Sequence, residues 1–293
     1  MMTTQDFSHF GSSDDVEHRL QKLGYVATRE VADTVFLADA LAKPVLVEGP
    51  AGTGKTELAI AIAGATSRPL IRLQCHEGID EARALYEWDY RKQLLSIQSG
   101  ASQDVADVFS EQFLIARPLL QAVRSPEPVV LLIDEVDQLD PESEALLLEL
   151  LSAFQVTIPE IGTLRSVHSP SIVLTSNGNR DLSDALRRRC LYLHIGYPPI
   201  DREAQIIRAR LPGVDAELAH RVAQTTAALR SFDLKKAPSV SEALDWARTL
   251  MLLGAVEVND ELLLSHANVL IKHQSDIDRL SAHLSAAAAE ESR

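Results

Sequence analysis

"PVLVEGPAGTGKTELAIAIAGAT", Pro44–Thr66, contains a short apolar run, a glycine-rich turn and a helical pattern in immediate succession. The run before Gly49 is apolar and ends at turn residues, which is typical of a buried strand. Strong helix formers follow the glycines and continue to a further glycine near the end, which predicts a helix. A strand that leads through such a loop into a helix is a building unit of parallel sheets.

Four further apolar runs follow, and they alternate with helical stretches. The runs are "PLIRLQ" at 69–74, "PVVLLIDE" at 128–135, "PSIVLTSN" at 170–177 and "CLYLHI" at 190–195. Strands that alternate with helices form a parallel sheet covered on both faces. We therefore predict an α/β fold with a five-stranded parallel sheet between helices.

Two segments interrupt this alternation, and we interpret both as insertions. One is a helix insertion at about 76–102, and the other is a β-hairpin at about 154–168. After the double proline of "GYPP" only helical patterns remain, which places a domain boundary there. The predicted organisation is a flexible amino terminus over 1–14, an α/β domain over 15–197 and an all-α domain over 198–293.

The loop "GPAGTGKT" matches the pattern G-x-x-x-x-G-K-[ST] in full. Glycines let backbone N–H groups surround phosphate oxygens, Lys55 brings a charge to the β and γ phosphates, and the Thr56 hydroxyl is a ligand for Mg²⁺. The helix that starts here adds the positive end of its dipole. A glycine-rich turn that matches by chance is the alternative, and the position between strand and helix disfavours it. We predict a nucleoside triphosphate site formed by Gly49, Pro50, Ala51, Gly52, Thr53, Gly54, Lys55 and Thr56.

An acidic pair follows the third apolar run, where "VVLLIDEVD" ends in Asp134 and Glu135. Ligands in open parallel sheets bind at the carboxyl ends of the strands. We expect Asp134 to hold Mg²⁺ with Thr56, and Glu135 to orient and deprotonate the attacking water. The alternative is two acids that start a surface loop. The absence of an N-K-x-D stretch disfavours a GTPase.

A third polar strand end is Asn177, which closes "SIVLTSN". Its amide is both donor and acceptor, so it can hold the attacking water or contact the γ phosphate. Read alone, Asn177 is equally consistent with a turn residue.

Three consecutive arginines lie in "SDALRRRCLYL", Ser183–Leu193, of an otherwise acidic chain. Read alone, they are either a phosphate-binding cluster or a solvated helix end whose charge suits the helix dipole. Successive helix residues point about 100° apart, so the three cannot all reach one phosphate.

Composition restricts the partners and the compartment. Forty-two acidic against twenty-eight basic residues give a net charge of −14, which disfavours nucleic acid and anionic membranes as partners. Cys75 and Cys190 fit neither a disulfide framework nor a metal cluster and favour a reducing compartment. We find no signal peptide and no apolar run long enough to span a membrane, and we expect a cytoplasmic protein.

Taken in order, "GPAGTGKT", "LLIDEVD", "LTSN" and "DALRRRC", followed by a helical tail, resemble an AAA+ ATPase with its P-loop NTPase core. The insertion after the second strand and the hairpin before "SIVLTSN" are similar to the MoxR branch. The stretches "LQCHEGIDEARALYEWDY", "LSAFQVTIPEIGTLR" and "RRRCLYLHIGYP" resemble its CoxD-like members. The resemblance covers about residues 18–285.

The resemblance implies a nucleotide-binding core and a helical lid, which assemble as a homo-oligomeric, hexameric ring with ATP and Mg²⁺ between subunits. Arg189 matches the family's position for an arginine that reaches the neighbour's γ phosphate, and Arg188 is second. The resemblance also implies a chaperone or remodelling ATPase that acts with a von Willebrand factor A domain protein. Its client would be a metalloenzyme such as carbon monoxide dehydrogenase, which it helps to mature.

One departure from the family pattern concerns the lid. "KKAPSVSEALDWA" has Val240 and Ser241 where a sensor arginine is usual, and we assign no lid residue to catalysis. Two other functions stay open: a nucleotide-gated scaffold, which Glu135 argues against, and a DNA-directed motor, which net acidity argues against. The client, the number of subunits and the choice between threading and remodelling are not fixed by the sequence.

Overall fold

A computed structural model describes residues 9–99, 108–255 and 258–291. The chain divides into two compact units. The first comprises residues 1–23, 27–49 and 55–194, and the second comprises residues 24–26, 50–54 and 195–293.

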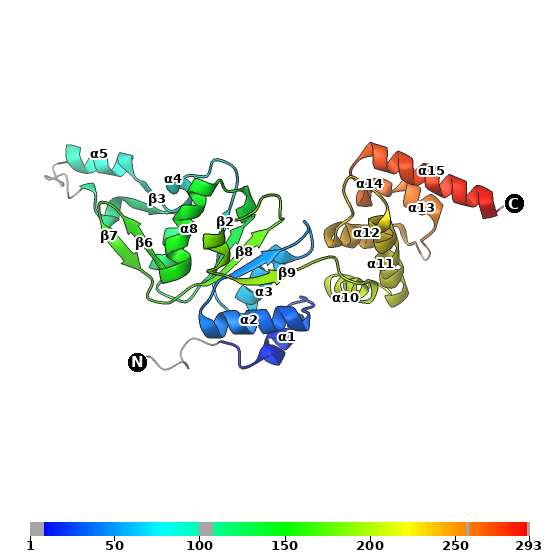
Figure 1. Ribbon diagram of the computed structural model, residues 1–293, viewed down its shortest axis with the longest axis horizontal. Coiled ribbons are helices and arrows are strands. Elements are labelled where there is room, and N and C mark those ends of the chain that lie inside the picture. The colour runs from blue at the N-terminus through cyan, green and yellow to red at the C-terminus, as the bar shows by residue number, and fades with distance from the viewer. Residues whose placement is uncertain (1–8, 100–107, 256–257, 292–293) are drawn as a thin grey trace. The chain divides into compact units, whose positions relative to one another are not determined.

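The first unit is built on a five-stranded parallel sheet with strand order β2-β5-β8-β1-β9 (Figure 1). Each strand lies within one of the five predicted apolar runs, so the predicted fold class is confirmed. The strands are β1 (Val45–Glu48), β2 (Leu70–Gln74), β5 (Val130–Asp134), β8 (Ser171–Ser176) and β9 (Leu191–His194).

Helices cover the sheet because its central strands are apolar on both faces. All five residues of β5 are buried. The helix α3 (Lys55–Thr66) contacts β5 and β8, α7 (Pro118–Arg124) contacts β2 and β5, and α2 (Arg29–Leu41) contacts β1 and β9. The buried strands therefore hold their carboxyl ends in fixed register, with Leu73 opposite Ile133 and Ile133 opposite Leu174.

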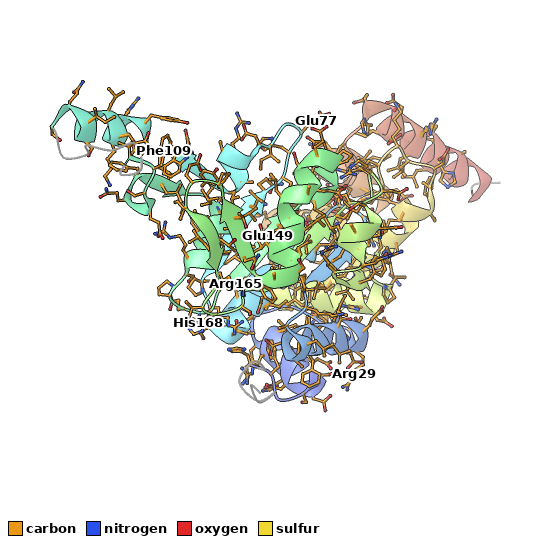
Figure 2. The ribbon with its side chains drawn as sticks, turned by 60° about the vertical axis from the view of Figure 1, so that its left-hand side comes forward. Arg29, Glu77, Phe109, Glu149, Arg165 and His168 are labelled. Carbon is orange, nitrogen blue, oxygen red and sulfur yellow. The ribbon has the colours of Figure 1, made fainter. Side chains whose placement is uncertain are left out.

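The helix α8 (Pro141–Ala153) follows the short 3-10 helix η2 (Val136–Gln138) after β5. The Asp140 side chain accepts a hydrogen bond from the Ser143 N–H, and Pro141 occupies the first turn, where its missing N–H costs nothing. The strands β6 (Gln155–Ile158) and β7 (Gly162–Arg165) then form an antiparallel hairpin beside α8 (Figure 2). Glu149 of α8 accepts the Thr157 N–H at 3.1 Å and so ties the hairpin to the helix.

The insertion contains strands that the sequence pattern does not predict. Within the predicted range of about 76–102 lie α4 (Glu81–Ala84), β3 (Tyr86–Trp88) and α5 (Tyr90–Gln98); the 3-10 helix η1 (Glu111–Phe113) and β4 (Leu114–Ala116) lie beyond the predicted end. Three-residue strands are too short for a period-2 pattern, yet β3 and β4 pair antiparallel. Edge-to-face packing of Trp88 on Phe109, with ring centroids 5.2 Å apart, stabilises them. Residues 100–102 of the predicted insertion lie outside the described residues.

Residues 9–14 of the predicted flexible stretch have defined contacts, and residues 1–8 of it lie outside the described residues. The helix α1 (Ser13–Lys22) already begins at Ser13, and Phe10 is buried. The backbone N–H groups of His9 and Phe10 donate to Asp39 of α2. One buried aromatic and one carboxylate on a distant helix fix this segment, and local polarity gives no sign of either.

The second unit contains only helices among its described residues: α10 (Ile200–Arg210), α11 (Ala216–Ser231), α12 (Val240–Leu253), α13 (Asp260–Ser265), α14 (Ala267–Leu270) and α15 (Gln274–Glu291). Its core surrounds the fully buried Trp246. A buried ion pair joins Arg230 to Glu203 through two bonds of 2.7 Å. Among the helices of the described ranges, none has the length and apolar character needed to cross a membrane.

Candidate nucleotide site

The glycine-rich loop joins the end of β1 to the start of α3. Gly52 and Gly54 have φ angles of 71° and 94°, which residues other than glycine rarely adopt. The Thr53 hydroxyl donates to the Pro50 carbonyl at 2.9 Å and closes the turn. The helix α3 begins at Lys55, directly after the loop, so its first N–H groups lie next to the loop backbone.

Lys55 is a buried cation in this site, with only 6% of its surface exposed. Its Nζ donates to the Gly49 carbonyl at 2.7 Å and to Asn177 Oδ1 at 2.9 Å. Desolvation lowers the pKa of Lys55, although Asp137, Asp134 and Glu135 oppose the shift. The loop lysine and the polar end of β8, which are 122 residues apart, are therefore in direct contact.

Asp134 is the centre of a hydrogen-bonded cluster at the end of β5. Its Oδ1 accepts from the Thr56 hydroxyl at 2.9 Å and from the Thr175 hydroxyl at 2.5 Å. Its Oδ2 accepts from Arg72 Nη2 at 2.5 Å. Thr175 and Arg72 are site residues that sequence reasoning missed, because each is an ordinary polar residue within a strand run. The parallel register of three strands is what brings them to Asp134.

Glu135 lies immediately after Asp134 in a strained backbone conformation. Its φ of 58° is left-handed, which is uncommon for a residue with a side chain and is concentrated at functional sites. Its N–H donates to the Thr175 hydroxyl at 2.9 Å. Its Oε2 accepts from the Gln74 amide at 2.9 Å. Gln74 ends β2, so a third strand end contributes a polar group that the sequence analysis did not identify.

The three arginines lie at the end of α9 (Asp184–Arg187), a single helical turn whose last residue is Arg187, and they have different surroundings. Arg187 pairs with Glu48, the last residue of β1, at 3.1 Å. Arg189 is partly buried, and its Nη1 donates to the Ala185 carbonyl at 2.6 Å. Arg188 is exposed, and no hydrogen bond or ion pair to another described residue holds its side chain. Of the two arginines predicted to reach a neighbour's γ phosphate, Arg188 therefore faces solvent and Arg189 bends back onto its own helical turn.

Both cysteines, Cys75 and Cys190, are free thiols. Burial raises the pKa of Cys75 and of Cys190 to about 12, so neither is a thiolate at neutral pH. In the described ranges, no group of three or more histidine, cysteine or acidic side chains is arranged to hold a metal ion.

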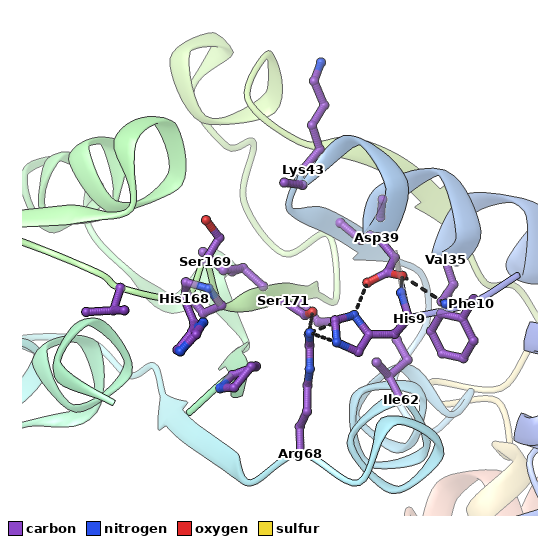
Figure 3. A pocket seen from close by; sticks show the side chains of 18 residues that line it. His9, Phe10, Val35, Asp39, Lys43, Ile62, Arg68, His168, Ser169 and Ser171 are labelled. Carbon is purple, nitrogen blue, oxygen red and sulfur yellow. Dashed lines mark hydrogen bonds and ion pairs between the residues drawn. The ribbon is translucent and has the colours of Figure 1, made fainter. Parts of the chain in front are cut away.

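A separate cavity of about 160 Å³ lies near the amino ends of β1 and β8, away from the loop (Figure 3). Its polar lining includes His9, Asp39, Arg68 and Ser171, and Arg68 donates to the Ser171 hydroxyl at 2.6 Å. None of the predicted site residues lines it. The polar groups at the carboxyl ends of the strands, and not this cavity, therefore define the candidate site.

Residues 44–190 match the AAA domain family, dynein-related subfamily. The match covers half of the chain and spans the loop, the acidic pair, Asn177 and the arginines. The chain belongs to this family. AAA+ proteins in general hydrolyse ATP with Mg²⁺ and often form oligomeric rings.

Two relatives and one solved structure are also similar to this chain. The chain is 24% identical over 231 residues to an uncharacterized protein of Staphylococcus aureus strain NCTC 8325. The aligned region covers 75% of this chain and 82% of the relative. It is also 24% identical over 220 residues to an uncharacterized protein of Staphylococcus haemolyticus, and that aligned region covers 73% of this chain and 78% of the relative. The fold is similar to that of a RuvB point mutant from Thermotoga maritima, with a TM-score of 0.50, 19% identity, and coverage of 92% of this chain and 72% of that one.

Proposed function

We propose that this protein is an ATPase of the MoxR type that uses ATP hydrolysis to remodel a client protein. The observation that carries the ATPase part is a pair of hydrogen-bonded clusters around the loop. In one, Lys55 contacts Asn177; in the other, Thr56 contacts Asp134 and Thr175 joins Asp134 to Glu135. Together the clusters provide a phosphate-binding lysine, oxygen ligands for a cation and a carboxylate base. An ATPase needs these three parts.

The oxygen atoms at the end of β5 fit a magnesium site. Mg²⁺ prefers hard oxygen ligands, and the Thr56 hydroxyl and the Asp134 carboxylate lie 2.9 Å apart. When bound, Mg²⁺ supplies positive charge at the β and γ phosphates. Arg72 now compensates the buried Asp134 carboxylate, and it is exposed enough to move aside.

Glu135 is the proposed general base. One of its carboxylate oxygens accepts a hydrogen bond from the Gln74 amide, which restrains the side chain. We expect Glu135 to leave Gln74 when it takes a proton from the attacking water. Asn177 and Lys55 would hold the γ phosphate, since their side chains are hydrogen-bonded to each other beside the loop.

ATP binding by the glycine-rich loop is the first part of this proposal to test. We expect Lys55→Ala to abolish ATP binding in isothermal titration, with Lys235→Ala of the second unit as the control for a lost surface charge. Equal ATP affinity in the Lys55 and Lys235 variants would overturn the assignment of the loop as the nucleotide site.

The proposed ring places arginines of one subunit at the ATP of the next. Arg189 is our first candidate and Arg188 the second, and the exposed side chain of Arg188 needs no rearrangement to reach another subunit. Mixing Arg189→Ala subunits with Lys55→Ala subunits should restore part of the ATPase rate at hybrid interfaces, and the same mixture with Arg188→Ala tests the second candidate. If both mixtures stay inactive while all variants assemble, the arginines are a solvated helix end.

The proposed partners are a von Willebrand factor A domain protein and a metalloenzyme client, for instance a carbon monoxide dehydrogenase. This part rests on the resemblance of the insertion, the hairpin and the stretch around the arginines to CoxD-like members of the MoxR branch. Affinity purification in the presence of ATP should recover a protein with such a domain, and recovery without ATP at the same yield would argue against nucleotide-controlled binding.

A further inference from the structure

The loop 178–183 connects Asn177 of the nucleotide site to the arginine turn α9. Two buried carboxylates from the segment after Glu135 hold this loop. Asp137 in η2 is 4% exposed, and its Oδ2 accepts the Asn179 N–H at 3.1 Å. The second carboxylate is Glu144 of α8, which is 2% exposed.

The Glu144 carboxylate makes two interactions, one with the middle of the loop and one with its end next to the arginines. Its Oε2 accepts the Ser183 N–H at 3.1 Å, and its Oε1 forms an ion pair with Arg180. The Ser183 side chain in turn caps α9 by accepting the Leu186 N–H at 3.3 Å. Glu144 therefore fixes the residue from which the arginine turn begins.

The arginine turn cannot fix its own position. The helix α9 has four residues, and an isolated single turn is unstable because nucleation costs more than its few hydrogen bonds return. Apart from Glu144, its described attachments are the buried Leu182 and Leu186 and the Arg187 pair with Glu48. Apolar contacts tolerate sliding, whereas a buried ion pair with a backbone N–H bond defines one geometry.

We propose that Glu144 is a positioning residue that holds the arginine turn in the orientation needed by the neighbouring subunit's ATP. This inference rests on the proposed function, in which Arg188 or Arg189 acts on that ATP. Glu144 has no described hydrogen bond to Lys55, to Asp134 or to Glu135. We therefore expect it to act on the ATP of the neighbouring subunit and to leave ATP binding in its own subunit unchanged.

The test uses two inactive parents that complement each other. An acceptor subunit, Arg188→Ala/Arg189→Ala, binds ATP but lacks the arginines, and a donor subunit, Lys55→Ala, supplies arginines but binds no ATP. In their mixture only the acceptor's ATP beside the donor's arginines can be hydrolysed. Glu144→Leu is then placed either in the donor or in the acceptor.

We expect Glu144→Leu in the donor to lower the restored ATPase rate by about tenfold or more, since a charged hydrogen-bonded anchor is lost. The same change in the acceptor should leave the restored rate within about twofold, because the acceptor's own site does not need Glu144. Glu144→Gln keeps an acceptor for the Ser183 N–H and should cause a smaller loss in the donor.

Equal losses in donor and acceptor would overturn the proposal and indicate a general folding role. No loss in the donor would overturn it as well. If Glu144→Leu does not assemble by size-exclusion chromatography, Arg180→Met in the donor removes the same ion pair and is judged by the same asymmetry. An inactive parent mixture would instead refute the arginine assignment of the proposed function, and the positioning role with it.

Discussion

Thr175→Val is the substitution that most specifically disturbs the acidic pair. Thr175 is 1% exposed, and its hydroxyl accepts from the Glu135 N–H at 2.9 Å and donates to Asp134 at 2.5 Å. Valine has nearly the same shape, so the packing of β8 is retained while both hydrogen bonds are lost. The Glu135 N–H then has no acceptor, and its left-handed backbone loses a support.

The expected magnitude follows from these two bonds. A hydrogen bond to a charged group contributes about 1.5–3 kcal/mol, and a donor left without an acceptor costs about 1–3 kcal/mol. We expect the free energy of unfolding to fall by about 3–5 kcal/mol. A displacement of Glu135 that costs only about 1.4 kcal/mol in the transition state lowers the rate about tenfold.

Urea unfolding and steady-state phosphate release, measured on Thr175→Val and Thr175→Ser, test this reasoning. Serine keeps the hydroxyl and loses only a methyl group, so its ATPase rate should stay within about threefold of the wild type. Equal losses in the two variants would show that the methyl group, and not the hydroxyl, matters. A wild-type rate for Thr175→Val would refute the role of the network.

Three further predictions concern other parts of the chain. Gln74→Ala should raise the basal phosphate-release rate by up to about tenfold, because it removes the hydrogen bond that holds Glu135; a lower rate would mean that Gln74 positions the base. Arg230→Leu should lower the free energy of unfolding in urea by about 3–5 kcal/mol by leaving buried Glu203 unpaired, and adding Glu203→Leu should recover much of this loss. Because desolvation lowers the pKa of Lys55, its charge is lost at lower pH than in an ordinary lysine; as pH rises, ATP affinity should weaken before ordinary lysines lose their charge, and that of Lys55→Arg should not.

The five strands of the sheet could be predicted because each is marked by a pattern within a short stretch of sequence. Each strand is an apolar run bounded by turn residues, and β1, β5 and β8 all end in polar groups that the parallel register brings to one edge. The loop glycines, Lys55, Thr56 and Asp134 follow from a pattern in which each residue type has a fixed chemical task.

The remaining site residues depend on contacts between distant segments. Thr175, Gln74 and Arg72 look like ordinary strand residues until strand order places them around Asp134 and Glu135. The small β3–β4 sheet is likewise invisible in its three-residue segments and depends on aromatic packing. Tertiary contacts of this kind override local pattern, and one sequence does not reveal them.

The nucleotide bound to Glu135→Gln after incubation with ATP and Mg²⁺ tests the central claim most directly. Glutamine keeps the size of Glu135 and an amide oxygen but cannot take a proton from water. Chromatography of the nucleotide released from the isolated protein should then give ATP for Glu135→Gln and ADP for the wild type. ADP on both proteins, formed at the same rate, would contradict the assignment of Glu135 as the base.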